Sequence, residues 1–284
     1  MAARTVLNRL EMASGLDRIG APLRRAVEAV VRGRLRDVLR GVWLGHPLHP
    51  VAVQLPMGAW MSAAVLDALP RTRAASTVLI GIGTASAAPA ALAGLNDWVA
   101  LSPEQRRVGL VHASANTVGL ALFAGSLAAR LSGNQRLGRG LVFAGLASVG
   151  LGGYLGGHLT YRLAAGVNQA EPFLRQIPEG WHDICDYAAL VENEPTTARI
   201  GDVPLLACRT RDGVTVMLGH CGHETGPLGD GDVTEIDGAA CITCPWHGSS
   251  FRLADAKVVR GPAATDQPQL RTRIVNGRVE AALP

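Results

Sequence analysis

Four long apolar stretches dominate the first 165 residues of the chain. They run over 51–69, 76–99, 108–131 and 141–163. Each is close to or above the roughly 20 residues that a helix needs to cross a bilayer. The fourth contains the GxxxG pairs Gly152/Gly156 and Gly153/Gly157, and small residues at this spacing let helix backbones approach closely in lipid. The pattern predicts a four-helix transmembrane bundle over 46–165, because the stretches lack the polar faces that a bundle in water would need.

The segment before these stretches, 1–45, is basic and amphipathic. From Pro22 onward apolar residues recur at helical spacing, while the arginines fall largely elsewhere. The apolar positions are Val27, Val30, Val31, Leu35 and Val38. Such a helix is expected to lie on an anionic membrane face, and the alternative is an ordinary solvated surface helix.

Polarity rises after residue 165 and the hydrophobic period changes. A proline-broken linker is expected over 166–199, followed by short strand-like runs separated by turn residues. The expected strands are Val203–Cys208, Val214–Gly219, Lys257–Arg260 and Leu270–Val275. Asn276-Gly277 predicts a tight hairpin. The fold class is therefore multidomain: a transmembrane helical bundle followed by a small antiparallel β domain over 200–284.

Composition supports a membrane protein. Charged residues make up 18% of the chain, and the mean hydropathy is +0.19 with a pI near 9.0. The arginines flank apolar stretches without an aromatic-basic pattern, so we expect a lipid bilayer as the partner rather than nucleic acid. Five cysteines fit no disulfide framework.

Two short loops near the C-terminal end carry the chemistry. Cys221-Gly222-His223 is followed by Cys244-Pro245-Trp246-His247. Two thiolates and two imidazoles are enough to hold one metal centre. This donor set suits either a [2Fe–2S] cluster with two Cys on one iron and two His on the other, or a Cys2His2 zinc site.

The flanking residues favour the cluster. The two loops, with CxHxxG-x-L and CPWHGSxF, closely resemble the Rieske family. The resemblance implies that Cys221 and Cys244 bind the buried iron and that His223 and His247 bind the outer one. It also implies that Ser249 donates a hydrogen bond to a cluster sulfide.

The departures from the family pattern indicate the ferredoxin type. Rieske proteins of the respiratory type carry a further Cys on each loop, joined by a disulfide, whereas the matching positions here are Gly226 and Trp246. Phe251 stands where high-potential members have a hydrogen-bonding Tyr. Fewer hydrogen bonds to sulfur stabilise the reduced cluster less, so we expect a potential in the lower part of the range of roughly −150 to +300 mV.

Four histidines lie near the ends of the apolar stretches. His46 and His49 precede the first, His112 begins the third and His158 ends the fourth. All four are expected on the side that carries the β domain. Three interpretations are open: axial ligands of a b-type haem, a metal or quinone-protonation site, or histidines that satisfy helix ends at the interface.

The region also resembles an uncharacterised family of bacterial four-helix membrane proteins with a His-Pro-x-His-Pro signature. The resemblance covers about 40–165 and rests on GHPLHP, the His112–Asn116 pair and the Gly-rich end of the fourth stretch. It implies a fold but no activity.

An even number of spans places both termini on one side of the cell membrane. Arginines near the termini outnumber those at the opposite end, so the positive-inside rule favours a cytoplasmic β domain. The arginines on the terminal side are Arg32, Arg34, Arg36, Arg40, Arg106, Arg107 and Arg162. Those on the other side are Arg71, Arg73, Arg130, Arg136 and Arg139.

The combined hypothesis is a membrane-anchored Rieske iron–sulfur protein. It would pass one electron between a soluble redox protein and a haem, quinone or metal on the membrane side. The alternatives are the electron-transfer component of an oxygenase or other oxidoreductase system, or a redox sensor with the helices as anchor only. A self-contained oxygenase is not expected, because only about 37 residues follow His247.

Overall fold

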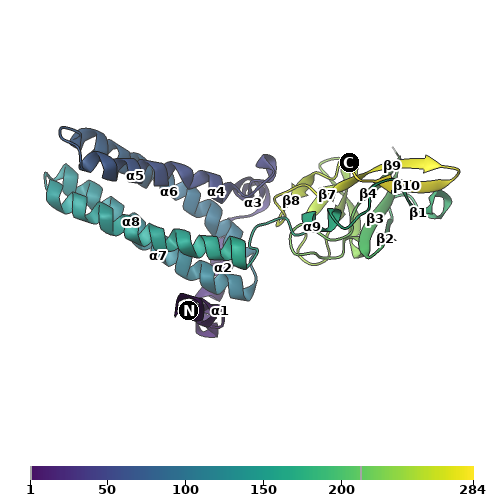
Figure 1. Ribbon diagram of the computed structural model, residues 1–284, viewed down its shortest axis with the longest axis horizontal. Helices are drawn as coiled ribbons and strands as arrows, with labels where there is room; N and C mark the ends of the chain where they lie inside the picture. The colour runs from purple at the N-terminus through teal and green to yellow at the C-terminus, as the bar shows by residue number, and fades with distance from the viewer. Residues whose placement is uncertain (1, 212) are drawn as a thin grey trace. The chain divides into compact units, whose positions relative to one another are not determined.

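The computed structural model describes residues 2–211 and 213–284, and these form two compact units (Figure 1). The helical unit combines the residues up to 39 with 48–165, and the β unit combines 40–47 with 166–284. The expected class, helices followed by an antiparallel β domain, is confirmed. The sequence did not indicate that the short segment 40–47 belongs to the β unit.

The β unit consists of two antiparallel sheets. The larger has the order β1-β10-β9-β4-β3-β2 and the smaller the order β5-β6-β7-β8. Strands of the larger sheet are β1 (His182–Asp186), β2 (Pro195–Ile200), β3 (Val203–Thr210), β4 (Gly213–Leu218), β9 (Gln269–Val275) and β10 (Arg278–Ala282). Strands of the smaller sheet are β5 (Asp232–Ile236), β6 (Ala239–Thr243), β7 (Ser250–Arg252) and β8 (Val258–Arg260). Short helices are η2 (Val42–Leu44), α9 (Glu171–Leu174), η4 (Tyr187–Ala189) and η5 (Leu228–Asp230).

Strand β3 separates two hydrophobic cores, because its side chains alternate between the faces of the sheet. Leu205 and Ala207 enter one core, and Leu206 and Cys208 enter the other. The first core also receives residues from the expected linker 166–199, which supplies β1, β2 and buried apolar side chains. The second core contains Phe251 of the smaller sheet. It is the core that borders the candidate cluster loops.

The predicted Asn276-Gly277 hairpin is confirmed. Val275 pairs with Arg278, so two residues form the loop between β9 and β10. Asn276 and Gly277 have φ angles of 50° and 77°. Positive φ at both central residues is what a type I′ turn requires, and Asn-Gly tolerates it.

Helices account for most of the other unit. They are α1 (Ala2–Glu11), η1 (Ser14–Leu16), α2 (Asp17–Val30), α3 (Gly33–Arg40), α4 (Leu48–Ala52), α5 (Gln54–Asp67), α6 (Arg73–Val99), α7 (Pro103–Leu131) and α8 (Gln135–Gly157), which continues as a π-helix (His158–Arg162). The prediction of a single amphipathic helix from Pro22 onward is wrong in detail. The backbone is extended at Val31, and Gly33 adopts a φ of 55°. Two separate helices, α2 and α3, therefore form.

Three helices are long and apolar enough to cross a membrane: α6, α7 and α8 with its π-helical extension. The first expected span, 51–69, lies in a helical stretch that is divided into α4 and α5 at Val53. Helical hydrogen bonding nevertheless continues across the division, because the Val53 amide donates to the His49 carbonyl and the Met57 amide to the Val53 carbonyl, both at 3.1 Å. At 1.5 Å per residue, α4 and α5 together extend about 30 Å, the thickness of a hydrocarbon core.

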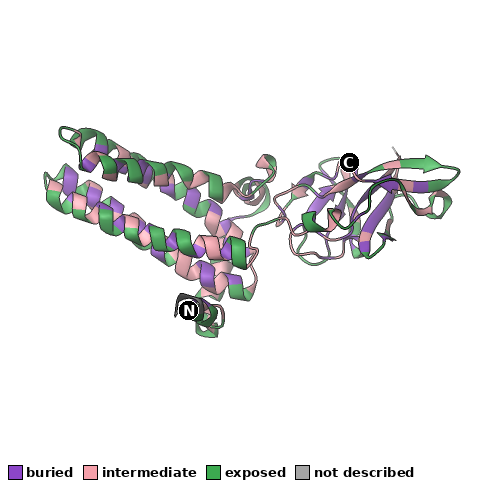
Figure 2. Cartoon of the chain, in the orientation of Figure 1, coloured by how far each residue is buried: buried purple, intermediate pink, exposed green. Residues whose placement is uncertain are grey.

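The apolar side chains of these helices point largely outward. Only 28%, 22% and 28% of the most apolar windows of the three spans are buried inside the protein, and Figure 2 shows exposed residues along their outer faces. Val78, Leu92 and Phe143 are 59%, 52% and 59% exposed. A bundle in water would bury such residues, so this surface fits a lipid environment.

The helical unit contains an internal repeat that the sequence analysis did not find. One hairpin consists of α4, α5 and α6, and the other of α7 and α8. His49, Trp60 and Asp67 in the first recur at identical spacing as His112, Phe123 and Arg130 in the second. Six of the nine buried residues of α6 correspond in spacing to the six buried residues of α8: Ser76, Ile80, Gly83, Ala87, Ala90 and Ala93 match Gly138, Val142, Gly145, Val149, Gly152 and Leu155.

Equivalent residues of the two hairpins meet one another. The rings of Trp60 and Phe123 stack with centroids 3.9 Å apart, and Arg130 forms a buried ion pair with Asp67. Residues on a two-fold axis contact their own equivalents. The two hairpins are therefore parallel repeats about an approximate two-fold axis along α5 and α7, an arrangement known from membrane proteins.

We predict that the Asp67–Arg130 pair tolerates exchange. Both side chains are almost fully buried, at 2% and 0% exposure, so Asp67→Ala or Arg130→Ala leaves an uncompensated charge and lowers the free energy of unfolding by about 3–5 kcal/mol. The exchange variant Asp67→Arg/Arg130→Asp keeps the pair and recovers most of this loss. Thermal melting in detergent measures all three variants, with Arg24→Ala at an exposed pair as control. An exchange variant no more stable than the single variants would contradict the two-fold arrangement.

Candidate metal centre

Two buried sulfur atoms form the base of the candidate site. Cys221 follows β4 and Cys244 follows β6, and they are 1% and 3% exposed. The two thiols hydrogen-bond to one another, which lowers the pKa of Cys244 and raises the pKa of Cys221. Amides of Trp246 and His247 also donate to the Cys244 sulfur and favour its thiolate. Thiolate is the form that binds metal.

Each cysteine begins a tight loop closed by main-chain hydrogen bonds. The Cys221 amide donates to the Gly226 carbonyl at 2.8 Å, and the Cys244 amide donates to the Ser249 carbonyl at 2.8 Å. The loops approach so closely that a Cβ on Gly226 would lie 2.8 Å from the Cys244 sulfur. The glycine is therefore needed for close approach, which the bulkier cysteine of the respiratory type would not permit in this arrangement.

Two imidazoles lie at the outer end of the site. The rings of His223 and His247 are 5.1 Å apart at an interplanar angle of 82°. The Nδ1 atom of His223 is buried without a hydrogen-bond partner, while the side chain of His247 is 43% exposed. Burial, followed by the charges of His247 and Arg40, lowers the pKa of His223 to about 4. A neutral imidazole with an unpartnered nitrogen fits metal coordination.

Ser249 and Phe251 lie beside the sulfurs as the sequence indicated. Ser249 is fully buried; its hydroxyl donates to the Cys221 sulfur and accepts from the Ala263 amide at 2.9 Å. Phe251 is also fully buried and offers no hydroxyl. The donor set of two thiols and two imidazoles, with one hydroxyl directed at sulfur, fits a [2Fe–2S] cluster with two unlike iron atoms.

Gln267 holds the first loop in place, and the sequence analysis missed it. Its amide group donates to the carbonyls of Leu218 and His220 at 2.8 and 2.7 Å. Its carbonyl oxygen accepts from the Gly222 amide at 3.1 Å. Its role could not be assigned from the sequence, because the loop that it holds lies more than 40 positions earlier in the chain. Glu224, whose carboxylate lies 3.8 Å from Nδ1 of His247, was also not anticipated.

The structure brings together two of the four membrane histidines. The rings of His49 and His112 are 6.2 Å apart at 81°. His158 is instead paired with Glu11, with its Nε2 2.8 Å from the carboxylate. His46 is exposed, contacts its neighbouring Pro47 carbonyl and belongs to the β unit.

The other cysteines do not join the candidate site. Cys208 and Cys241 are buried in the β unit and Cys185 is half-buried. Burial raises the pKa of Cys208 to about 11, so this thiol stays protonated and behaves as an apolar side chain.

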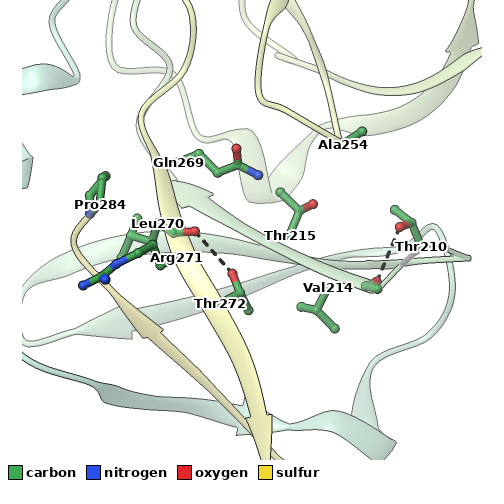
Figure 3. A pocket seen from close by; sticks show the side chains of 10 residues that line it. Thr210, Val214, Thr215, Ala254, Gln269, Leu270, Arg271, Thr272 and Pro284 are labelled. Carbon is green, nitrogen blue, oxygen red and sulfur yellow. Dashed lines mark hydrogen bonds between the residues drawn. The ribbon is translucent and has the colours of Figure 1, made fainter.

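A surface hollow of about 480 Å³ lies elsewhere on the β unit (Figure 3). Thr210, Thr215, Gln269 and Arg271 are among its lining residues, and none of the described lining residues carries a thiol or an imidazole. The hollow is therefore separate in its chemistry from the metal centre.

Comparison with known families decides the identity of the β unit. Residues 180–272 match the model of the Rieske [2Fe-2S] domain. The chain carries a Rieske domain. Residues 45–169 match a family described as a predicted membrane protein (DUF2231). That description does not carry the His-Pro-x-His-Pro label, which stays a prediction. The Rieske match supports the [2Fe–2S] cluster and electron transfer, and gives no support to haem b.

Individual relatives resemble the Rieske domain alone. A human protein described as a Rieske domain-containing protein is 35% identical over 63 residues, which are 22% of this chain and 40% of that protein. The ferredoxin of Sphingomonas yanoikuyae B1 is 25% identical with a TM-score of 0.33, covering 37% of this chain and 100% of the ferredoxin. The ferredoxin of carbazole 1,9a-dioxygenase from Nocardioides aromaticivorans IC177 is 16% identical with a TM-score of 0.34, over 37% and 100%.

We predict that Gln267→Leu destabilises the Rieske domain. The change leaves the carbonyls of Leu218 and His220 and the Gly222 amide without their partner, and each buried unpaired group costs about 1–3 kcal/mol. The expected result is a lower melting temperature and a lower iron content after purification. Gln269→Leu is the matched control, because Gln269 lies half-buried at the surface hollow. Equal melting temperatures for the two variants would contradict the role of Gln267.

Proposed function

We propose that this protein is a membrane-attached Rieske electron carrier that exchanges one electron at a time with a soluble redox protein and with a quinone or metal in the membrane. Cys221 and Cys244 would hold the inner iron, and His223 and His247 the outer iron. The observation that supports this best is the buried thiol pair next to two imidazoles, one of which has a buried nitrogen without a partner.

The cysteine loops and His247 have different roles in the proposed electron transfer. The [2Fe–2S] cluster, when bound, takes up and releases a single electron. The buried cysteine loops exclude water from the sulfur end. His247, the most exposed of the four candidate ligands, offers the shortest route to a docked partner, because its side chain is 43% exposed while both cysteines are buried.

Besides the main-chain amides that donate to the Cys244 sulfur, few side-chain hydroxyls reach the candidate cluster sulfurs, so a potential in the lower part of the Rieske range of roughly −150 to +300 mV is proposed. Ser249 supplies one hydroxyl, and Phe251 supplies none. Gly226 and Trp246 exclude a disulfide between the loops. The reduced cluster, which carries more negative charge, is therefore stabilised weakly.

Electron paramagnetic resonance of the dithionite-reduced protein tests the proposal. We expect a Rieske signal in detergent-purified protein, and its loss in Cys221→Ser and in His247→Ala. His182→Ala is the control, since His182 lies on β1 and its Nε2 contacts the Pro178 carbonyl at 2.8 Å. Protein that retains iron but shows no Rieske signal, or a signal that survives loss of His247, would refute the ligand assignment.

A redox titration of the same signal tests the effect of hydrogen bonding. Ser249→Ala is expected to lower the potential by up to roughly 65–130 mV. A hydrogen bond to a charged group is worth about 1.5–3 kcal/mol, and for a one-electron couple about 59 mV corresponds to a tenfold change in the equilibrium constant. Ser250→Ala is the matched control, because its hydroxyl bonds Thr243 and the Gly248 carbonyl instead. An unchanged potential in Ser249→Ala would argue against a hydroxyl at the cluster.

A cytoplasmic Rieske domain is the topology we propose. Arg130 is neutralised by Asp67, which leaves fewer free arginines on the side opposite the termini. Reporter fusions at each end of the chain measure the arrangement: green fluorescent protein folds in the cytoplasm, and alkaline phosphatase becomes active outside it. Both ends are expected inside, which requires α4 and α5 to cross the membrane together. Ends on opposite sides would show that they do not cross.

A further inference from the structure

His49 and His112 occupy equivalent positions in the two helix hairpins and have equivalent surroundings. Nδ1 of His49 lies 2.8 Å from the Ala90 carbonyl of α6. Nδ1 of His112 lies 2.7 Å from the Gly152 carbonyl of α8. Ala90 and Gly152 are themselves equivalent in the repeat, so the two hydrogen bonds are copies of one arrangement.

A glycine makes room for each ring. A Cβ on Gly94 would lie 2.8 Å from Nδ1 of His49, and a Cβ on Gly156 would lie 3.3 Å from the His112 ring. Gly94 and Gly156 stand one helical turn beyond the carbonyls that accept the hydrogen bonds. One of the two GxxxG pairs of the fourth span therefore accommodates His112 and Asn116, while Gly153 meets nothing within 4 Å.

The hydrogen bonds determine which nitrogen is available. A carbonyl oxygen can only accept, so Nδ1 of each ring carries the proton. The neutral imidazole then presents the lone pair of Nε2. Ring orientation through Nδ1–H to a main-chain carbonyl is the usual arrangement of a metal-binding histidine. The Nδ2 atom of Asn116 lies 3.2 Å from Nε2 and 3.5 Å from Nδ1 of His112, so in this tautomer it donates to Nε2. A metal ion at His112 would replace this hydrogen bond, while the Asn116 amide keeps its bond to the His112 carbonyl at 3.0 Å.

The separation of the rings suits a shared ion. A metal–nitrogen bond of about 2.0–2.1 Å places two imidazoles on one ion with centroids roughly 5 to 6 Å apart. The observed 81° for His49 and His112 resembles the 82° of His223 and His247, the pair proposed to share an iron in the same chain. Their separation of 6.2 Å lies just above this range, so a shared ion requires either a wide nitrogen–metal–nitrogen angle or a small closing movement of the rings.

We propose that His49 and His112 bind one late first-row transition-metal ion, through their Nε2 atoms, on the approximate two-fold axis of the helical unit. Imidazole nitrogen suits zinc, copper and nickel. Water would complete the coordination, since these two histidines supply only two ligands. The site does not depend on the Rieske cluster, and its chemistry does not involve the thiols.

Binding of Zn²⁺ to full-length, cluster-loaded protein in detergent tests the proposal. We expect one Zn²⁺ per chain, with an absorption-edge spectrum that shows imidazole nitrogen and no sulfur. Sulfur ligands in the spectrum would place the ion in the Rieske loops. Absence of bound Zn²⁺ would mean that His49 and His112 have a structural role only. Either result overturns the proposal, and the wild-type measurement requires no variant.

Variants then locate the ion. His49→Gln and His112→Gln are each expected to weaken Zn²⁺ binding roughly 100-fold or more, because loss of a group that merely orients a ligand already costs about 10–100-fold. His158→Gln, whose ring pairs with Glu11, is the matched control and should bind as wild type does. The Rieske signal, measured in every variant, reports folding and cluster content independently. Unchanged binding in the His49→Gln/His112→Gln double variant would overturn the assignment.

Discussion

A buried polar group must find a partner, and this constraint explains the architecture of both units. In the helical unit the guanidinium of Arg130 meets the Asp67 carboxylate, and the Ser76 hydroxyl completes the cluster. In the Rieske domain Gln267 satisfies two carbonyls and one amide next to the first loop. An unpaired group at any of these places would cost more than the interaction contributes. Several buried side-chain atoms of the described residues still lack a hydrogen-bond partner, and one of them, Nδ1 of His223, lies where a metal would complete it.

The internal repeat shows how the same constraint acts on a symmetric arrangement. A residue on a two-fold axis faces its own equivalent, so two copies of a charged residue would repel each other in a medium that screens charge poorly. The ion-pair layer therefore has to differ between the hairpins, with Asp67 in one and Arg130 in the other. Aromatic rings have no such conflict, and Trp60 and Phe123 stack. Two neutral imidazoles do not repel each other in this way, so both hairpins can carry a histidine at this position, His49 in one and His112 in the other.

Much of the Rieske domain could be predicted because its signals are local. Cys221, His223, Cys244 and His247 lie in two short loops, and Asn276-Gly277 marks its own turn. Gln267 and the segment 40–47 could not be found in this way, because their roles depend on contacts distant in sequence. The internal repeat could not be found from the sequence for another reason. The two hairpins share the positions and spacing of their buried residues but have few identical residues. The division at Val53 and the break before Gly33 show that apolar periodicity predicts where helices lie better than where they are interrupted.

The order of the layers along α5 and α7 fits the depth profile of a bilayer. The aromatic layer lies between the histidine layer near the start of these helices and the ion pair near their ends. Charged and titratable groups cost least near the two interfaces and most at the centre. The stacked rings of Trp60 and Phe123 occupy the middle, where no hydrogen-bond partner from water is available, and the buried Nε1 atom of Trp60 has no partner there. The two polar layers thus stand at opposite ends of an apolar one. The ion pair is satisfied by its own charges and the Ser76 hydroxyl, whereas the histidine layer offers ring nitrogens to a further ligand.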